Sequence, residues 1–415
     1  MAEERKKPYI MRKEYLDAII SFKDDQIVKV ITGIRRSGKS TLLFDIYTDY
    51  LFKNGVAEEQ IIKVDLEPME AKPLYSQDAL YKHITDRLLG DRMNYVFIDE
   101  AQNCDGYEHV ADSLYIKKNV DVYITGSNAH MYSGELSTLL SGRYIEIEML
   151  PLSFREFVSA TKKPDETLPQ KYLEYVKFGG FPKVVDYNGN SRKINTYLDG
   201  IYNAIFKKDI IQKKSITNVP MFEAVMRFVL ANIGSQISAK SISDYLNSNK
   251  KKTYPQAVDD FLECLVESYM VYKAERYNVK SKEILKSLGK YYATDIGLRN
   301  YLLGFREIDT GHVLENIIYL ELLRRGYKVF IGKVDDNEVD FVAQKQDDVL
   351  YIQVAETLNG EGGKEKTLQR ELAPFKAIKD YNQRLLLTMD YDPNTSYDGI
   401  RHINALDFLM SDKYR

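Results

Sequence analysis

A phosphate-binding pattern lies near the start of the chain. The stretch TGIRRSGKST places Gly33, Gly38, Lys39 and Ser40 at the spacing G-x-x-x-x-G-K-[ST]. Glycines at these positions let backbone N–H groups wrap phosphate oxygens, while the lysine reaches the β- and γ-phosphates and the hydroxyl ligates Mg²⁺. The residues predicted to bind the nucleotide are Gly33, Arg35, Arg36, Ser37, Gly38, Lys39, Ser40 and Thr41.

Two elements must flank such a loop, and both are predicted here. Residues 27–31 (IVKVI) are mostly β-branched and predict a short buried strand. Residues 41–47 predict a helix, whose N-terminal dipole would face the bound phosphates. The alternative is an ordinary loop that fits the pattern by chance, and the strand before it and the helix after it argue against that reading.

An acidic pair ends a second predicted strand in NYVFIDEAQ (94–102). Asp99 is a candidate magnesium ligand, and Glu100 is a candidate to polarise the attacking water. Ligands bind at the carboxyl ends of parallel strands, so this position suits both roles. The alternative is that the two acids only terminate a strand.

Two further candidate catalytic residues follow. The third predicted strand, in NVDVYITGSNAHM, ends on Thr125, Ser127 and Asn128, of which Asn128 is our candidate to sense the γ-phosphate. Arg143 opens the next alternating stretch and is a candidate to stabilise transition-state charge, either in cis or across a subunit boundary. A surface ion pair is the alternative interpretation of Arg143.

Together the segments TGIRRSGKSTLL, YVFIDEAQ, ITGSNAHM and SGRYIEIEMLPLSFREF resemble the bacterial and archaeal AAA-superfamily P-loop ATPases, over about residues 10–160. The resemblance implies ATP with Mg²⁺, an acidic pair, a polar sensor and a late arginine. By position these are Lys39, Ser40, Asp99, Glu100, Asn128 (or Ser127) and Arg143. An arginine acting between subunits would also imply a homo-oligomer.

The middle of the chain, residues 161–305, is predicted to be mainly helical. FGGFPKVV (178–185) resembles an element that follows the nucleotide domain in the same ATPases and opens a helical domain of unknown function. Residues 236–277 then run helix, turn, longer helix and strand, the order of a winged helix. Lys250, Lys251, Lys252 and Lys280 would contact the phosphates of double-stranded DNA. Acids at 259, 260, 263 and 267 disfavour deep insertion beside phosphates and favour a protein partner instead.

The C-terminal region, residues 306–415, resembles the restriction-endonuclease-like fold. In that fold a helix Glu, a strand Asp and an acid-x-Lys pair gather Mg²⁺, and here those places hold Glu315, Asp340, Gln353 and Ala355. Because Gln353 is neutral and Ala355 cannot activate water, we interpret the region as a nuclease fold without nuclease activity. A site rebuilt with Glu356 or Lys364, and a chance arrangement of strands, are the alternatives.

Composition and charge narrow the class of protein. The 415 residues carry a net charge of −3, but residues 201–300 hold 16 basic and 10 acidic side chains. This excess suggests an anionic partner for the middle, and a solvated lysine-rich surface is the alternative. Neither a membrane-length apolar run nor a signal peptide is predicted, and Cys104 and Cys264 suggest neither disulfides nor zinc, which fits the cytoplasm.

The sequence therefore predicts an α/β protein with three parts: a P-loop AAA-type ATPase domain (1–160), a helical and winged-helix region (161–305) and a degenerate restriction-endonuclease-like domain (306–415). We expect ATP binding and hydrolysis, with the nucleotide state controlling DNA binding. The alternative is a nucleotide-gated switch that binds a protein partner and not DNA.

Overall fold

The computed structural model describes residues 9–127, 139–212, 216–305, 310–360 and 363–413. The chain forms two compact units. The first is Met1–Pro151 with Glu267–Tyr269, and the second is Leu152–Val266 with Met270–Arg415.

The first unit is built on a five-stranded, all-parallel sheet in the order β2-β3-β4-β1-β5. Its strands are β1 (Val28–Thr32), β2 (Ile61–Asp65), β3 (Asn94–Asp99), β4 (Val120–Thr125) and β5 (Tyr144–Glu148). The three strands predicted to carry the site are β1, β3 and β4, which are adjacent in this sheet. Their carboxyl ends therefore meet at one edge.

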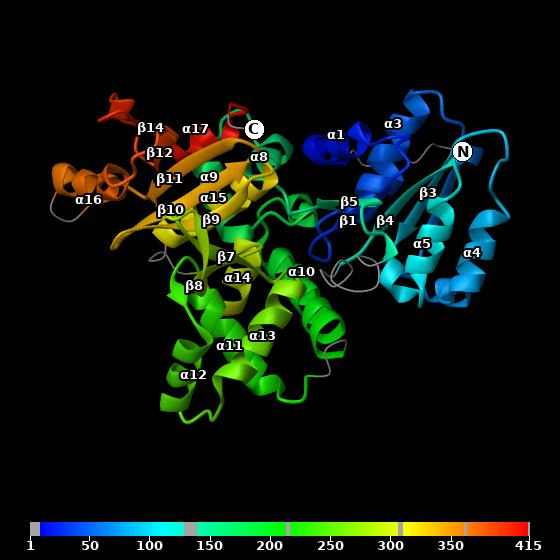
Figure 1. Cartoon of the computed structure of the whole chain (residues 1–415), viewed down its shortest axis with the longest axis horizontal. Helices are drawn as coiled ribbons and strands as arrows, with labels where there is room; N and C mark the ends of the chain where they lie inside the picture. Colours follow the sequence, from blue (N-terminus) through cyan, green and yellow to red (C-terminus); the bar gives the residue numbers. More distant parts are fainter. Residues whose placement is uncertain (1–8, 128–138, 213–215, 306–309, 361–362, 414–415) are drawn as a thin grey trace. The chain divides into compact units, whose positions relative to one another are not determined.

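Helices cover both faces of this sheet (Figure 1). They are α1 (Lys13–Ser21), α2 (Lys39–Thr41), α3 (Thr48–Lys53), α4 (Gln77–Thr85) and α5 (Tyr107–Tyr115), with π-helical turns over Leu42–Tyr47 and 3₁₀ turns over Glu58–Gln60, Met69–Leu74 and Ala101–Asn103. The helix predicted after the phosphate loop is present, but its middle is π-helical rather than α-helical.

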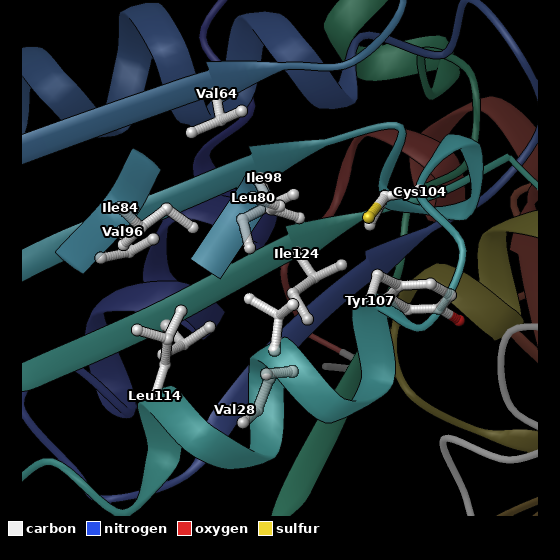
Figure 2. Close-up of a cluster of buried hydrophobic side chains, with 14 of the residues drawn as sticks. Val28, Val64, Leu80, Ile84, Val96, Ile98, Cys104, Tyr107, Leu114 and Ile124 are labelled. Atoms are coloured by element: carbon white, nitrogen blue, oxygen red, sulfur yellow. The ribbon is translucent and has the colours of Figure 1, made fainter. Parts of the chain in front are cut away.

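Side-chain alternation along the strands separates two hydrophobic cores. Val96 and Ile98 point to the face covered by α4 and α5, where they pack with Leu80 and Leu114 (Figure 2). Phe97, the residue between them, points to the opposite face and joins the core formed with α1 and the phosphate-loop helix. Both faces of the strands are apolar because helices bury both of them.

The second unit contains a nine-stranded mixed sheet in the order β13-β14-β12-β11-β10-β9-β7-β8-β6. Its strands are β6 (Gln236–Ile237), β7 (Val271–Asn278), β8 (Glu283–Ala293), β9 (Lys328–Val334), β10 (Asn337–Lys345), β11 (Asp348–Ala355), β12 (Gln383–Thr388), β13 (Ser396–Tyr397) and β14 (Ile400–Asn404). Parallel pairing of β7 with β9 joins the strands of the middle region to those of the C-terminal region. The predicted division at residues 305/306 therefore lies inside one compact unit.

Most helices of the second unit lie in the middle region of the chain, and the others lie before or after strands of the C-terminal region. They are α8 (Phe154–Thr161), α9 (Leu168–Phe178), α10 (Ser191–Ala204), α11 (Val219–Ala231), α12 (Ala239–Ser248), α13 (Pro255–Glu267), α14 (Ile296–Leu303), α15 (Thr310–Arg324), α16 (Lys364–Lys376) and α17 (Ala405–Met410), with a π-helical stretch over Ile205–Gln212 and a 3₁₀ turn over Pro182–Tyr187. In the described part of the chain, every helix is too short or too polar to cross a bilayer.

The Gly-Gly-Phe-Pro element is locked onto the start of α14. Gly179 has a positive φ of 79°, and a Cβ there would lie 2.2 Å from Oδ1 of Asp295, so any other residue would be strained. The Asp295 carboxylate accepts hydrogen bonds from the Gly180 N–H (2.6 Å) and from the Leu298 N–H (2.7 Å). This carboxylate therefore links the loop after α9 to the N-terminus of α14.

Burial raises the pKa of the Asp295 carboxyl to about 6, against the lowering effect of the backbone N–H groups of Gly180, Leu298 and Gly297. The folded protein thus holds this proton more tightly than the unfolded chain does. The contribution of Asp295 to the free energy of unfolding is then largest below pH 4 and is lost as the pH rises through about 6.

We expect an Asp295→Asn variant to lack this part of the pH dependence. Urea unfolding followed by circular dichroism at several pH values between 4.5 and 7 would measure the free energy of unfolding of wild type and variant. As the pH rises, the free energy of unfolding of the variant should increase relative to that of the wild type. The exposed Asp244→Asn change on α12 is the control, and parallel profiles for wild type and Asp295→Asn would contradict the assignment.

Candidate nucleotide site

The phosphate loop is held at the carboxyl edge of the parallel sheet, directly after β1. Gly33 has φ 125° and Gly38 has φ 105°, conformations that favour glycine. Lys39 is buried, and its Nζ donates to the backbone carbonyls of Gly33 (3.0 Å) and Ile34 (3.3 Å). The ammonium therefore points into the loop, where the phosphates of a nucleotide would bind.

Asp99 connects three segments of this site. The Ser40 hydroxyl, in the first turn of α2, donates to Oδ2 of Asp99 at 2.6 Å, and the Thr125 hydroxyl at the end of β4 donates to Oδ1. Thr125 Oγ1 also accepts the backbone N–H of Glu100 at 3.0 Å. The structure thus brings together Ser40 and Asp99, the two residues predicted to hold magnesium.

Glu100 lies beside Asp99 in a left-handed backbone conformation, with φ 51°. Its Oε2 accepts a hydrogen bond from the Ser127 hydroxyl at 3.1 Å and another from the Gln102 side chain. Arg35 Nη2 lies 4.0 Å from the same oxygen, and Arg35 Nη1 lies 3.2 Å from Oε1 of Glu67. Glu100 is therefore held by neutral donors, with a loop arginine beside it.

The two acids of this pair differ in proton affinity. Burial raises the pKa of Asp99 to about 6, although the hydroxyls of Ser40 and Thr125 oppose the shift. Burial would also raise the pKa of Glu100, but the charges of Lys39 and Arg35 outweigh it and leave that pKa below its ordinary value. Glu100 is thus kept ionised, the form that a residue polarising water needs.

Arg12, which no sequence motif marks, contacts the phosphate loop. Its buried guanidinium donates from Nη1 to the Ser37 carbonyl in the phosphate loop (2.9 Å) and from Nη2 to the Leu150 carbonyl (2.7 Å). It also lies over the ring of Tyr15 at 4.9 Å. No motif marks an isolated arginine before the first strand, so only the tertiary structure could identify it.

One hydrogen-bonding group of the phosphate loop is not used by the contacts within the loop. The Ser37 hydroxyl is buried, and among the described residues it has no hydrogen-bond partner. A buried hydroxyl without a partner costs free energy unless a ligand or water satisfies it. Together with the inward ammonium of Lys39 and the Ser40–Asp99 pair, this fits a magnesium nucleotide.

Two predicted residues, Arg143 and Arg36, are placed differently. Arg143 precedes β5, which pairs in parallel with β1 from Tyr144 opposite Val28, so it lies at the amino edge of the sheet, roughly 16 Å from the phosphate-loop edge. Its Nη1 binds Oδ1 of Asp112 at 2.9 Å, which is the surface ion pair considered above, and the structure does not bring it to the site in cis. The Arg36 side chain is largely exposed. Asn128 lies outside the described residues.

The residues predicted in the C-terminal region are also brought together. Glu315 (α15), Asp340 (β10) and Gln353 (β11) are buried, and Gln353 Oε1 accepts the Asp340 N–H at 3.3 Å. The substitutes considered above are engaged elsewhere, because Glu356 accepts from Thr310 and Lys364 binds Asp392. A residue not predicted for this site, Lys290 on β8, binds Glu315 at 2.9 Å.

Comparisons with known proteins agree with the nucleotide site. Residues 25–158 match the AAA domain family, and residues 169–309 match a domain of unknown function. An uncharacterized protein of Haemophilus influenzae is 37% identical over 407 residues, covering 97% of this chain and 99% of that protein. An uncharacterized protein of Methanocaldococcus jannaschii is 32% identical over 376 residues, covering 85% and 79%.

A solved Walker-type ATPase of Pyrococcus abyssi shares the fold, with a TM-score of 0.50 and 16% identity over 71% of this chain and 98% of that chain. The chain belongs to the family of the Haemophilus and Methanocaldococcus proteins. Its first unit carries an AAA domain of the P-loop ATPase class, a fold that implies nucleotide binding. The match to a domain of unknown function follows the AAA match in the chain and includes the Gly-Gly-Phe-Pro element.

We expect Arg12→Met to weaken nucleotide binding about tenfold and to lower the free energy of unfolding by about 2–3 kcal/mol, because buried hydrogen bonds to a charged donor are lost. Titration with a fluorescent ATP analogue and chemical unfolding would measure the two effects. Arg143→Met is the matched control, since its exposed ion pair contributes about 0–1 kcal/mol. Equal nucleotide affinity in the two variants would refute the role of Arg12.

Proposed function

We propose that the first unit binds Mg²⁺–ATP and hydrolyses it, with Glu100 orienting the attacking water. The observation that carries the proposal is the hydrogen bond from Ser40 to Asp99 beside the inward Lys39. The Glu100 carboxylate lies next to this pair and is held by Ser127 and Gln102. Phosphoryl transfer needs positioned charge more than covalent chemistry, and this arrangement supplies it.

Each residue has a distinct task in this proposal. Lys39 neutralises charge on the β- and γ-phosphates, and the loop N–H groups hold the phosphate oxygens. Ser40 and Asp99 would hold Mg²⁺, which when bound neutralises charge developing on the phosphates. Ser127 and Gln102 fix the direction of the Glu100 carboxylate. Arg35 is near enough to attract that carboxylate, so nucleotide binding, by engaging Arg35, would release it towards the water.

We further propose that the nucleotide state controls binding of double-stranded DNA through α12 and α13. The support is an element order of helix α11, strand β6, helices α12 and α13, and hairpin β7–β8, which matches a winged helix. Lys250, Lys251 and Lys252 are exposed in the turn before α13, and Tyr254 beside them is 79% exposed. Lys280 pairs with Asp335, so its phosphate contact is the least supported of the four.

A second candidate function is a nucleotide-gated switch that binds a protein partner. The observation in its favour is that Asp259, Asp260 and Glu263 are all exposed on α13, the helix that would enter a DNA groove. Three carboxylates there oppose phosphates and suit a basic protein surface.

Replacing Glu100 by Gln should lower kcat for ATP hydrolysis by at least about 10²-fold while leaving ATP binding intact, because the amide cannot accept the proton of the attacking water. Phosphate release and analogue binding, measured on the same preparations, separate the two effects. Lys39→Ala is the companion variant and should lose binding as well. Hydrolysis at the normal rate in either variant would contradict the proposed site.

The partner is tested by measuring ATP hydrolysis with and without double-stranded DNA, and DNA affinity at several salt concentrations. The DNA proposal predicts a several-fold higher rate and a steep fall of affinity with salt. Replacing Lys250, Lys251 and Lys252 together by Gln should reduce the salt slope by about 3. Lys82→Gln, a surface change on α4, is the control. No DNA effect on either quantity would favour the protein partner.

A further inference from the structure

Lys290 lies among three carboxylates contributed by two other elements of the second unit. Its Nζ is 2.8 Å from Oε1 of Glu338, 2.9 Å from Oε1 of Glu315 and 3.9 Å from Oδ1 of Asp340. Glu315 comes from α15, and the other two carboxylates come from β10. We call these four side chains the Lys290 cluster.

The cluster is enclosed. The side chains of Lys290 and Glu315 are 6% and 8% exposed, and that of Asp340 is 13% exposed, while Glu338 is 31% exposed and closes the solvent side. Tyr292 donates its hydroxyl to Oε1 of Glu315 at 2.7 Å. Buried charges of one sign are strongly unfavourable without a counter-charge, so a cation is required at this position.

The ammonium occupies the point where a divalent ion would have to bind. Mg²⁺ needs oxygen ligands at about 2.0–2.1 Å in octahedral geometry, and several of them from water or carboxylates. Lys290 instead sits at hydrogen-bonding distance between Glu315 and Glu338. Within the described residues, no group of three or more His, Cys, Asp or Glu side chains is arranged to hold a metal ion.

Other polar atoms in and beside the Lys290 cluster are also hydrogen-bonded. Oδ2 of Asp340 accepts the Val354 N–H at 2.8 Å, and Gln353 Nε2 donates to Glu371 at 3.1 Å. Gln236 donates to the second oxygen of Glu338. These bonds keep the cluster in one arrangement, and a metal ion would have to break several of them.

The carboxyl groups of the Lys290 cluster differ in the direction of their pKa shifts. Burial would raise the pKa of Glu315, but the Lys290 charge outweighs this and holds that pKa below its ordinary value. Burial, followed by the charge of Glu315, raises the pKa of Asp340 well above its ordinary value. The remaining titratable groups facing the cluster are Tyr292 and His312, whose Nδ1 lies 3.6 Å from Glu315. A single ammonium thus lies between two carboxylates, Glu315 and Glu338, and the third carboxyl, Asp340, has a raised pKa.

We propose that Lys290 is the resident cation of this cluster and excludes a divalent metal ion from it. The proposal goes beyond ATP hydrolysis and partner binding, and it stands or falls independently of both. The fold resemblance implied a metal at Glu315 and Asp340, and the residues present do not fit one. The C-terminal strands then form a folded scaffold around an internal ion pair rather than a metal-dependent phosphodiesterase centre.

The test measures Mn²⁺ binding by electron paramagnetic resonance of the free ion, without nucleotide, in a full-length Lys39→Ala background that weakens the nucleotide site. The parent should show no saturable Mn²⁺ site below about 1 mM. Lys290→Met leaves three carboxylates without a cation, so it should lower Tm by roughly 6–12 °C and create one Mn²⁺ site. Adding Mn²⁺ should then raise the Tm of this variant and not that of the parent.

A second change separates charge balance from loss of packing. Lys290→Met with Glu315→Gln removes one carboxylate as well, and should lose the Mn²⁺ site while recovering part of the lost Tm. Lys280→Met, in an exposed pair with Asp335, is the matched control and should behave as the parent.

Two results would overturn the proposal, and the first needs no Lys290 variant. One is a stoichiometric Mn²⁺ site in the parent that Glu315→Gln abolishes, or cleavage of supercoiled plasmid that depends on Glu315. The other is a Lys290→Met protein that keeps its Tm and gains no Mn²⁺ site.

Discussion

The carboxylate of Asp99 is the contact on which the nucleotide site depends. It is buried at the end of β3 and is hydrogen-bonded by Ser40 from the phosphate-loop helix and by Thr125 from β4. These three segments are brought to one edge only because β1, β3 and β4 are parallel and adjacent. If β4 were displaced from its position between β3 and β1, the loop, the acidic pair and the hydroxyls would no longer converge.

Arg12 makes another long-range contact of the phosphate loop within the first unit. By binding the Ser37 carbonyl and the Leu150 carbonyl with one guanidinium, it connects the phosphate loop to the residues that follow β5. A bidentate, permanently charged group suits this task because both acceptors are buried carbonyls that would otherwise lack part of their hydrogen bonding. The phosphate loop and the chain at Leu150 therefore share one hydrogen-bonding partner inside the first unit.

The second unit uses charge in a different way. Two of its buried acidic centres, Asp295 and the Lys290 cluster, join separate elements: one caps α14 and holds the Gly-Gly-Phe-Pro loop, and the other is an ion pair between β8, α15 and β10. Both join segments that are far apart in the sequence. Because β7 pairs with β9, these centres lie in one folded unit that includes the middle and the C-terminal regions.

The sequence by itself determined the local chemistry of the nucleotide site. Lys39, Ser40, Asp99 and Glu100 were predicted from spacing alone, because a phosphate loop and a strand-end acidic pair are short-range patterns. The strands β1, β3 and β4 were likewise indicated by their apolar, often β-branched residues. The order of the strands, and so the amino-edge position of Arg143, was decided by tertiary pairing. The same holds for Arg12 and Lys290, since each derives its role from acceptors more than twenty residues away. Long-range ion pairs and hydrogen bonds leave no periodic signal in a single sequence, and only the folded chain places their partners within reach.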